Sequence, residues 1–252
     1  MLKERLKWMA AWMAMALMTI GAIRYVPEVV SVSTGVDGRE LPICCVDAEK
    51  SQAALSIDAV WGNDNILKIL KVLADQKVQA SFFVTGKWAE EYPEDVKAIC
   101  EAGHDLGSLG ENYRDMTKLD RQELDEELGQ SHAALKKCAG VDVELFRPPY
   151  GAYSDEMAQS VREKGYYAIA WSVDSLDWKD YGADAIAETV CSHKNLENGA
   201  IILCHAGAKY TVQALESMID GLQSQGYEIV PVSRLIYRED YHMEAGGKQT
   251  LN

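Results

Sequence analysis

Four side chains able to carry acid/base chemistry each stand directly after a short apolar run of the chain: Asp58, Arg147, Asp174 and His205. The runs that precede them cover residues 54–57, 145–146, 171–173 and 201–204. In α/β barrels the functional groups lie at the C-terminal ends of the strands, so we expect these side chains to share one rim. A single aspartate at such a point commonly caps a helix, and a single histidine is more often structural. Their combination carries the argument.

Together these residue types suit the hydrolysis of an amide or an ester. Asp58 can accept a proton from water, and His205 can donate one to a leaving amine. Two prolines after Arg147 fix the backbone and present the guanidinium rigidly toward a carboxylate. We expect Arg147 to lower the pKa of Asp58, and Asp174 to raise the pKa of His205.

The elements that must position these residues alternate in type along the chain. Apolar strand-like runs and helix-period stretches follow one another as 80–85 and 89–101, 145–146 and 155–164, 167–173 and 183–192, and 200–204 and 212–225. Further strands are expected at 40–46, 53–58, 104–107 and 228–232. Nearly continuous apolar strands between helices are typical of a parallel sheet covered on both faces. About seven β/α units predict an α/β fold, a distorted, incomplete (β/α)7-type barrel.

Composition excludes some function classes. The net charge of -14 would repel nucleic-acid phosphates, so no nucleic-acid partner is expected. Six cysteines are present without any C-x-x-C pair, which argues against a zinc ribbon or a thioredoxin-like site. We interpret them as small core residues, with disulfides left open.

The chain ends carry their own signals. Basic residues precede an uncharged, mostly apolar run at 8–23, which predicts a signal anchor or signal peptide over 1–28. We favour a retained anchor helix, with the domain outside the cytoplasm because the basic charge precedes the run. A linker at 29–38, one domain at 39–238 and a flexible tail at 239–252 complete the expected organisation.

Several motifs resemble those of the polysaccharide deacetylases, the carbohydrate esterases with a NodB homology fold. The stretches that carry the resemblance are 54–58, 80–86, 103–107, 171–178 and 202–205, together with Arg-Pro-Pro-Tyr-Gly at 147–151. The resemblance implies that Asp58 is the catalytic base and His205 the acid, oriented by Arg147 and Asp174. It also implies substrate contacts from Pro149, Tyr150, Trp178 and Leu203. The expected partner is an N-acetylated cell-wall glycan.

The chain departs from this family where a divalent metal, usually zinc or cobalt, would be held. The family's two histidines, spaced H-x-x-x-H, correspond to Leu109 and Tyr113, and its metal-binding aspartate corresponds to Ala59. Leucine and alanine have no atom that coordinates a cation, so no metal ligand is assigned. An alternative, oxygen-rich site remains open, built from Asp64, Glu111, Asn112, Tyr113 and Asp115.

Two functions follow as hypotheses. The first is de-N-acetylation of a cell-wall glycan, such as peptidoglycan, with weak or absent activity because the metal site is degenerate. The second is a non-catalytic glycan-binding or spore-assembly protein, a pseudoenzyme. The 41–43 strand, Trp61-Gly62 and the degenerate second motif also resemble a sporulation-associated subgroup, the PdaB-type proteins. An ordinary metal-dependent chitin or xylan deacetylase is disfavoured by the missing ligands.

Overall fold

The computed structural model describes residues 35–36 and 39–252. The anchor helix predicted within 1–28 lies outside the described residues, as does most of the predicted linker at 29–38. Among the helices that the structure describes, none combines the length and apolar character needed to cross a membrane. All six cysteines lie in the described part, and none of them forms a disulfide.

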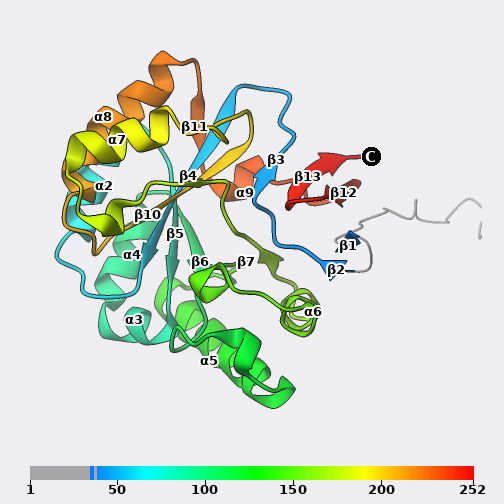
Figure 1. Cartoon of the computed structure of the whole chain (residues 1–252). Coiled ribbons are helices and arrows are strands. Elements are labelled where there is room, and N and C mark those ends of the chain that lie inside the picture. Colours follow the sequence, from blue (N-terminus) through cyan, green and yellow to red (C-terminus); the bar gives the residue numbers. More distant parts are fainter. Residues whose placement is uncertain (1–34, 37–38) are drawn as a thin grey trace, which may run out of the picture.

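A parallel sheet forms the centre of the molecule (Figure 1). Its order runs β10 (Ala200–His205), β4 (Gln52–Ala59), β5 (Ser81–Val84), β6 (Asp105–Ser108), β7 (Leu145–Phe146) and β8 (Tyr167–Ala168). Two short strands, β9 (Val173–Asp174) and β11 (Glu228–Val230), pair in parallel with β10 and β4. Parallel pairing brings the C-terminal strand ends to one rim, as the sequence predicts.

The sheet curves into an incomplete barrel. On one side β3 (Cys45–Val46) pairs antiparallel with β10, and on the other an isolated bridge joins Ile43 to Ile169, just beyond β8. The segment 43–46 therefore spans the gap between the first and last parallel strands with few hydrogen bonds. This arrangement confirms the predicted distorted α/β barrel.

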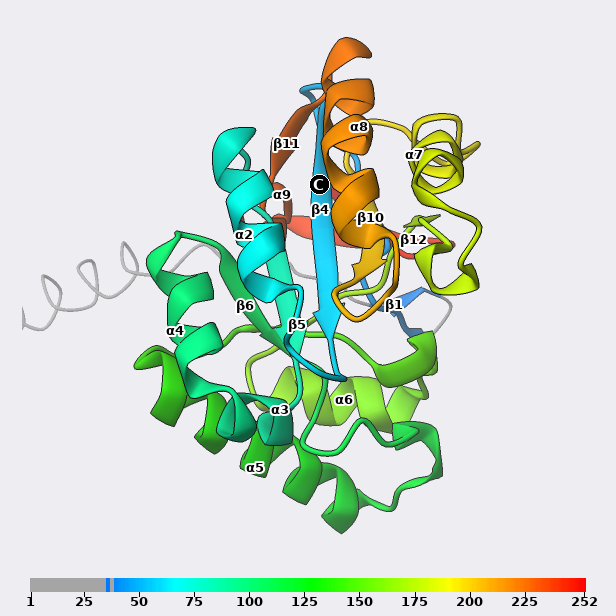
Figure 2. The same ribbon diagram turned by 90° about the vertical axis from the view of Figure 1, so that its left-hand side faces the viewer.

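Helices cover the outside of the sheet, and Figure 2 shows α2 and α8 in front of β4. They are α2 (Ile66–Asp75), α3 (Gly86–Glu91), α4 (Pro93–Glu101), α5 (Arg121–Ala139), α6 (Asp155–Glu163), α7 (Ala183–Cys191), α8 (Thr211–Ser224) and α9 (Val232–Leu235). The longest, α5, begins with a reciprocal capping box between Asp120 and Glu123. Its C-cap is Gly140, which adopts the left-handed conformation with φ of 72°.

Alternation along β4 explains why the barrel has two apolar layers and a polar centre. Leu55 and Ile57 pack outward against the helices, whereas Ala54 belongs to the inner cluster. Ser56 and Asp58 lie on the inner side of the same strand, and both are buried. The strand thus delivers a carboxylate to the barrel interior at its C-terminal end.

The expectation of a flexible tail at 239–252 is wrong. Residues 241–251 form a hairpin of β12 (Tyr241–Glu244) and β13 (Lys248–Leu251), and β13 pairs with β3. Gln249 is fully buried and exchanges two hydrogen bonds with the backbone of Tyr237. The sequence prediction failed because it weighed the glycines and polar residues rather than the partner strand.

Two further short strands, β1 (Gly35–Val36) and β2 (Arg39–Glu40), pair with each other.

Candidate active site

Asp58 and Arg147 form an ion pair inside the barrel. The Nη1 of Arg147 donates to Oδ1 of Asp58 at 2.6 Å, and both side chains are buried. Nη2 donates to Ser56 Oγ and to the carbonyl of Ala170, and the guanidinium lies 4.1 Å from the centroid of the Phe83 ring. The aromatic face and these acceptors compensate for burying the cation. This geometry confirms that the two predicted residues meet.

Arg147 lowers the pKa of Asp58 as predicted, but the net pKa of this carboxyl is raised. Burial raises the pKa of this carboxyl above its ordinary value, and this outweighs the opposing influence of the Arg147 and His205 charges. Removing a carboxylate from water penalises its charged form more than the neighbouring cations favour it. Asp58 is therefore a stronger base than an exposed aspartate.

His205 stands beside Asp58, because the two residues are register partners near the C-terminal ends of the paired strands β10 and β4. Its partner is Asp177. The Nδ1 of His205 lies 2.7 Å from Oδ1 of Asp177, and the backbone N–H of His205 donates to Oδ2 of the same carboxylate. Thr211 donates to Oδ2 as well, so this fully buried aspartate is held by three groups. The bond at Nδ1 leaves Nε2 as the nitrogen available to a ligand.

The prediction that Asp174 orients the histidine is wrong. Asp174 ends β9, and its Oδ1 accepts the N–H of Leu176 in the turn that follows. Leu176 takes a left-handed conformation there, which brings the 3-10 turn Asp177–Lys179 (η3) back toward β10. The sequence signal that could have identified Asp177 is its place next to Trp178, within the motif that carries the family resemblance.

Asp177 also decides the protonation of the histidine. Burial alone would lower the pKa of His205, but the hydrogen bond and charge of Asp177, with smaller effects of Asp58 and Asp174, raise it above the usual value. The pKa of Asp177 is correspondingly lowered, although its burial acts in the opposite direction. A carboxylate beside an imidazole stabilises the imidazolium, so the site favours a protonated histidine.

A cleft of about 720 Å³ opens over these groups. Predicted residues Asp58, Asp174, His205, Tyr150, Trp178 and Leu203 line it. Pro149 does not, because it is buried at the start of the turn Pro149–Gly151 (η2), and Pro148 takes the expected place in the wall. Sequence reasoning missed other wall residues, which are Val60, Trp61, Trp171, Asp180, Gly207, Ala208 and Lys209.

The positions expected to hold a metal are apolar or aromatic. Ala59 and Leu109 are both fully buried, Ala59 in the outer core and Leu109 in the inner core beside Phe83. Tyr113 lines the cleft between the rings of Trp61 and Tyr150, and burial raises the pKa of its phenol to about 12. Neither alkyl side chain has a donor atom, and the phenol stays protonated. These residues do not fit a zinc or cobalt ion.

Comparisons with known proteins identify the family to which this barrel is similar. A family model described as polysaccharide deacetylase matches residues 46–169. The chain resembles the structure of a mutant CE4 family pseudoenzyme with restored enzymatic activity, with a TM-score of 0.74, 30% identity, and coverage of 77% of this chain and 70% of that one. The wild-type pseudoenzyme from Bacillus anthracis matches with the same TM-score at 29% identity, over 77% of this chain and 68% of that one.

This chain belongs to the polysaccharide deacetylase family. Its relatives include the uncharacterized protein YlxY of Bacillus subtilis, 30% identical over 77% of this chain and 60% of that protein. Another is a peptidoglycan-N-acetylglucosamine deacetylase of Bacillus cereus, 30% identical over 72% of this chain and 66% of the relative. The chain thus spans about two thirds or less of the length of these relatives.

The oxygen-rich metal site considered as an alternative, from Asp64 to Asp115, would require its side chains to lie close together. The described residues contain no group of three or more His, Cys, Asp or Glu side chains placed to hold a metal ion. Asp64 lines a separate small hollow, and the side chain of Glu111 is buried against Gly86. A Cβ atom on Gly86 would meet Oε2 of Glu111 at 1.9 Å, so this carboxyl packs against α3.

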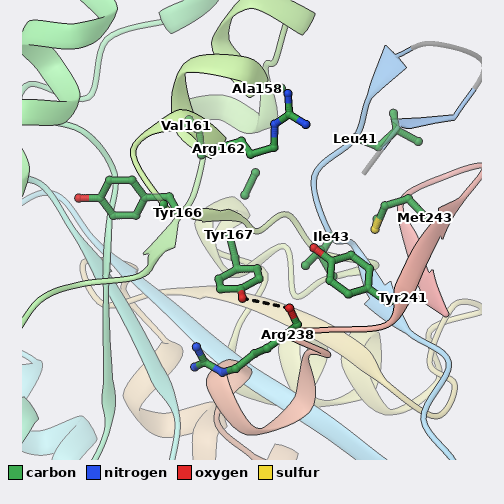
Figure 3. A pocket seen from close by; sticks show the side chains of 12 residues that line it. Leu41, Ile43, Ala158, Val161, Arg162, Tyr166, Tyr167, Arg238, Tyr241 and Met243 are labelled. Carbon is green, nitrogen blue, oxygen red and sulfur yellow. Dashed lines mark hydrogen bonds between the residues drawn. The ribbon is translucent and has the colours of Figure 1, made fainter. Parts of the chain in front are cut away.

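A smaller pocket of this deacetylase-family barrel, on the side of β12, contains none of the predicted site residues (Figure 3). Its volume is about 280 Å³, and it lies between α6, β8, β12 and the segment that includes Ile43. The dashed line in Figure 3 marks the hydroxyl of Tyr167 donating to the carbonyl oxygen of Arg238 at 3.4 Å. Its walls offer apolar and aromatic side chains with two arginines, and no acid/base pair like that of the cleft.

Proposed function

We propose that this protein binds an N-acetylated cell-wall glycan, such as peptidoglycan, in the cleft above Asp58 and His205, without metal-dependent turnover. One observation carries the proposal: the metal positions are filled by Ala59, Leu109 and Tyr113, while the rest of the cleft is retained. A metal supplies several kcal/mol of transition-state stabilisation in hydrolysis. Without about 5 kcal/mol of it, turnover slows more than a thousandfold.

The aromatic rim of the cleft supports a carbohydrate ligand. Trp61, Tyr150 and Trp178 line the cleft and yet remain 67%, 64% and 57% exposed. Large, solvent-exposed aromatic rings gathered on one rim are typical of a binding surface, because a bound ligand would bury them. The similarity to proteins named as peptidoglycan deacetylases supports a cell-wall glycan as that ligand.

The test combines three measurements on the full chain: metal content, amine release from N-acetylglucosamine oligomers and peptidoglycan with added zinc or cobalt, and binding of the same glycans. We expect binding without stoichiometric metal and without amine release. Stoichiometric metal with rapid turnover would overturn the proposal, and so would the absence of glycan binding.

Slow metal-independent deacetylation is a second candidate, favoured by the two oriented pairs Asp58–Arg147 and His205–Asp177. A binding protein has no chemical need for a base and an acid held side by side. Replacing His205 by Ala separates the candidates: a residual amine release that disappears in H205A would favour this second function, whereas an unchanged background would exclude it.

Location and biological role rest on the sequence alone. We propose that residues 1–28 anchor the domain at the outer face of the cell membrane, because basic residues precede the apolar run. The PdaB-type resemblance supports a role in sporulation. Fractionation of a sporulating culture, with protease treatment of intact cells, tests the location: a cytosolic, protease-protected protein would contradict the anchor.

A further inference from the structure

Three aromatic rings from separate loops form a continuous ladder at one wall of the cleft. The Trp61 and Tyr113 rings meet edge to face with centroids 5.4 Å apart, and the Tyr113 and Tyr150 rings lie 4.8 Å apart. These residues follow β4, β6 and β7, so the barrel itself brings them together. The central ring occupies a position where the family usually has a metal-binding histidine.

The ladder is held at an energetic cost. Tyr113 and Tyr150 have φ angles of 57° and 62°, in the left-handed region that non-glycine residues rarely adopt. Strain of this kind persists where the surroundings impose it and is concentrated at functional sites. The hydroxyl of Tyr150 donates to the carbonyl of Tyr113, and Trp88 Nε1 donates to the carbonyl of Gly62, next to Trp61. The rings are therefore fixed before any ligand arrives.

Tyr113 and Tyr150 also line a second hollow of about 550 Å³, with Arg114, Asp115, Lys118 and Leu119. The two tyrosines are thus the ridge shared by the main cleft and this second hollow. Charges in the second hollow are matched, since Lys118 pairs with Asp115 at 2.9 Å and Arg114 with Glu123 at 2.8 Å. A ligand that crosses the ridge needs apolar faces and no net charge.

We propose that the ladder Trp61–Tyr113–Tyr150 is a stacking platform over which a neutral, N-acetylated oligosaccharide passes from the main cleft into the second hollow. This inference rests on the proposed glycan binding and adds two points to it. The ligand is a glycan chain rather than a single sugar, and Tyr113 joins Trp61 and Tyr150 as a binding residue. The exposed ring of Trp61 and that of Tyr150 flank Tyr113, so successive sugars meet successive rings.

The test titrates the full chain with N-acetylglucosamine, with its neutral hexamer and with the cationic glucosamine hexamer, following tryptophan fluorescence or heat. We expect the neutral hexamer to bind at least tenfold more tightly than the monomer. Trp61→Ala and Tyr113→Ala should each weaken hexamer binding roughly tenfold and weaken monomer binding by a smaller factor. Tyr113→Phe keeps the ring and should bind like the wild type.

Leu67→Ala, an exposed apolar residue on α2, is the matched control and should change neither affinity. Trp61 is 67% exposed, so its replacement tests the platform even if Tyr113→Ala fails to fold. Hexamer and monomer binding equally well, or Trp61→Ala leaving hexamer affinity intact, would overturn the platform while glycan binding stood. Preference for the glucosamine hexamer would overturn the neutral ligand. Binding of none of these glycans would overturn the proposed function as well.

Discussion

The predicted site has an acid/base half and a metal half, and the two follow different physical rules. On one side Asp58–Arg147 and His205–Asp177 keep close ion pairs inside the barrel. On the other side Ala59 and Leu109 have joined the apolar cores, and Tyr113 has joined an aromatic ladder. Removing one partner of a buried ion pair strongly lowers the stability of the fold. A position that holds no metal, in contrast, can be filled by a side chain that packs against its neighbours. Apolar or aromatic side chains at these three positions are thus compatible with a well-formed barrel.

Rebuilding the metal half should give the largest effect. We expect the triple variant Ala59→Asp, Leu109→His, Tyr113→His to bind zinc and to release amine from N-acetylglucosamine oligomers over a thousandfold faster than the wild type. Metal content and amine release with and without a chelator measure it.

The control for this rebuilding adds His205→Ala to the triple variant, and we expect it to keep the metal and lose the turnover. Since Leu109 is fully buried, the free energy of unfolding without metal should fall in both variants. A triple variant that folds, binds stoichiometric zinc and remains inactive would show that the acid/base half is no longer competent.

Breaking the acid/base half should damage stability instead. Replacing Arg147 by Met leaves Asp58 buried without its cation, which costs about 3–5 kcal/mol in the free energy of unfolding. The double variant Arg147→Met, Asp58→Asn should recover part of this loss, because the uncompensated charge is gone. Urea denaturation measures both, with Arg121→Met as the control, whose pair with Glu163 is exposed. Equal effects at positions 147 and 121 would contradict the argument.

The His205–Asp177 pair should act through pH. The raised pKa of His205 means that its contribution to stability is fully present below the ordinary value of 6.5 and is lost as pH rises through the folded-state pKa. Asp177→Asn should lower the pKa of His205 and remove this slope, at a cost of about 1.5–3 kcal/mol at acidic pH. Titration of the imidazole by NMR and unfolding curves at several pH values measure the two effects. A histidine pKa that does not change in the variant would rule out Asp177 as its cause.

The apolar pattern was enough to predict the barrel, since strands such as β4 and β10 are mostly apolar runs that carry Asp58 and His205 near their C-terminal ends. The wall of the cleft was harder to predict. Trp61 and Tyr113 come from loops after different strands, and no local pattern says that their rings touch. The hairpin at 241–251 depends on pairing with β3, about 200 residues earlier, which local composition does not encode.

The error at Asp174 has the same origin and gives the smallest expected effect. The expectation that functional groups end strands selects Asp174. However, the left-handed Leu176 turns the chain so that Asp177 contacts His205 instead. Asp174→Asn keeps an oxygen for the N–H of Leu176, so we expect the free energy of unfolding to change by less than about 0.5 kcal/mol. The imidazole of His205 should show only a small fall in pKa, because Asp174 acts on it through charge alone. Measured beside Asp177→Asn under the same conditions, a fall of equal size in both variants would mean that the histidine responds to the summed charge of the cleft and not to its hydrogen-bond partner.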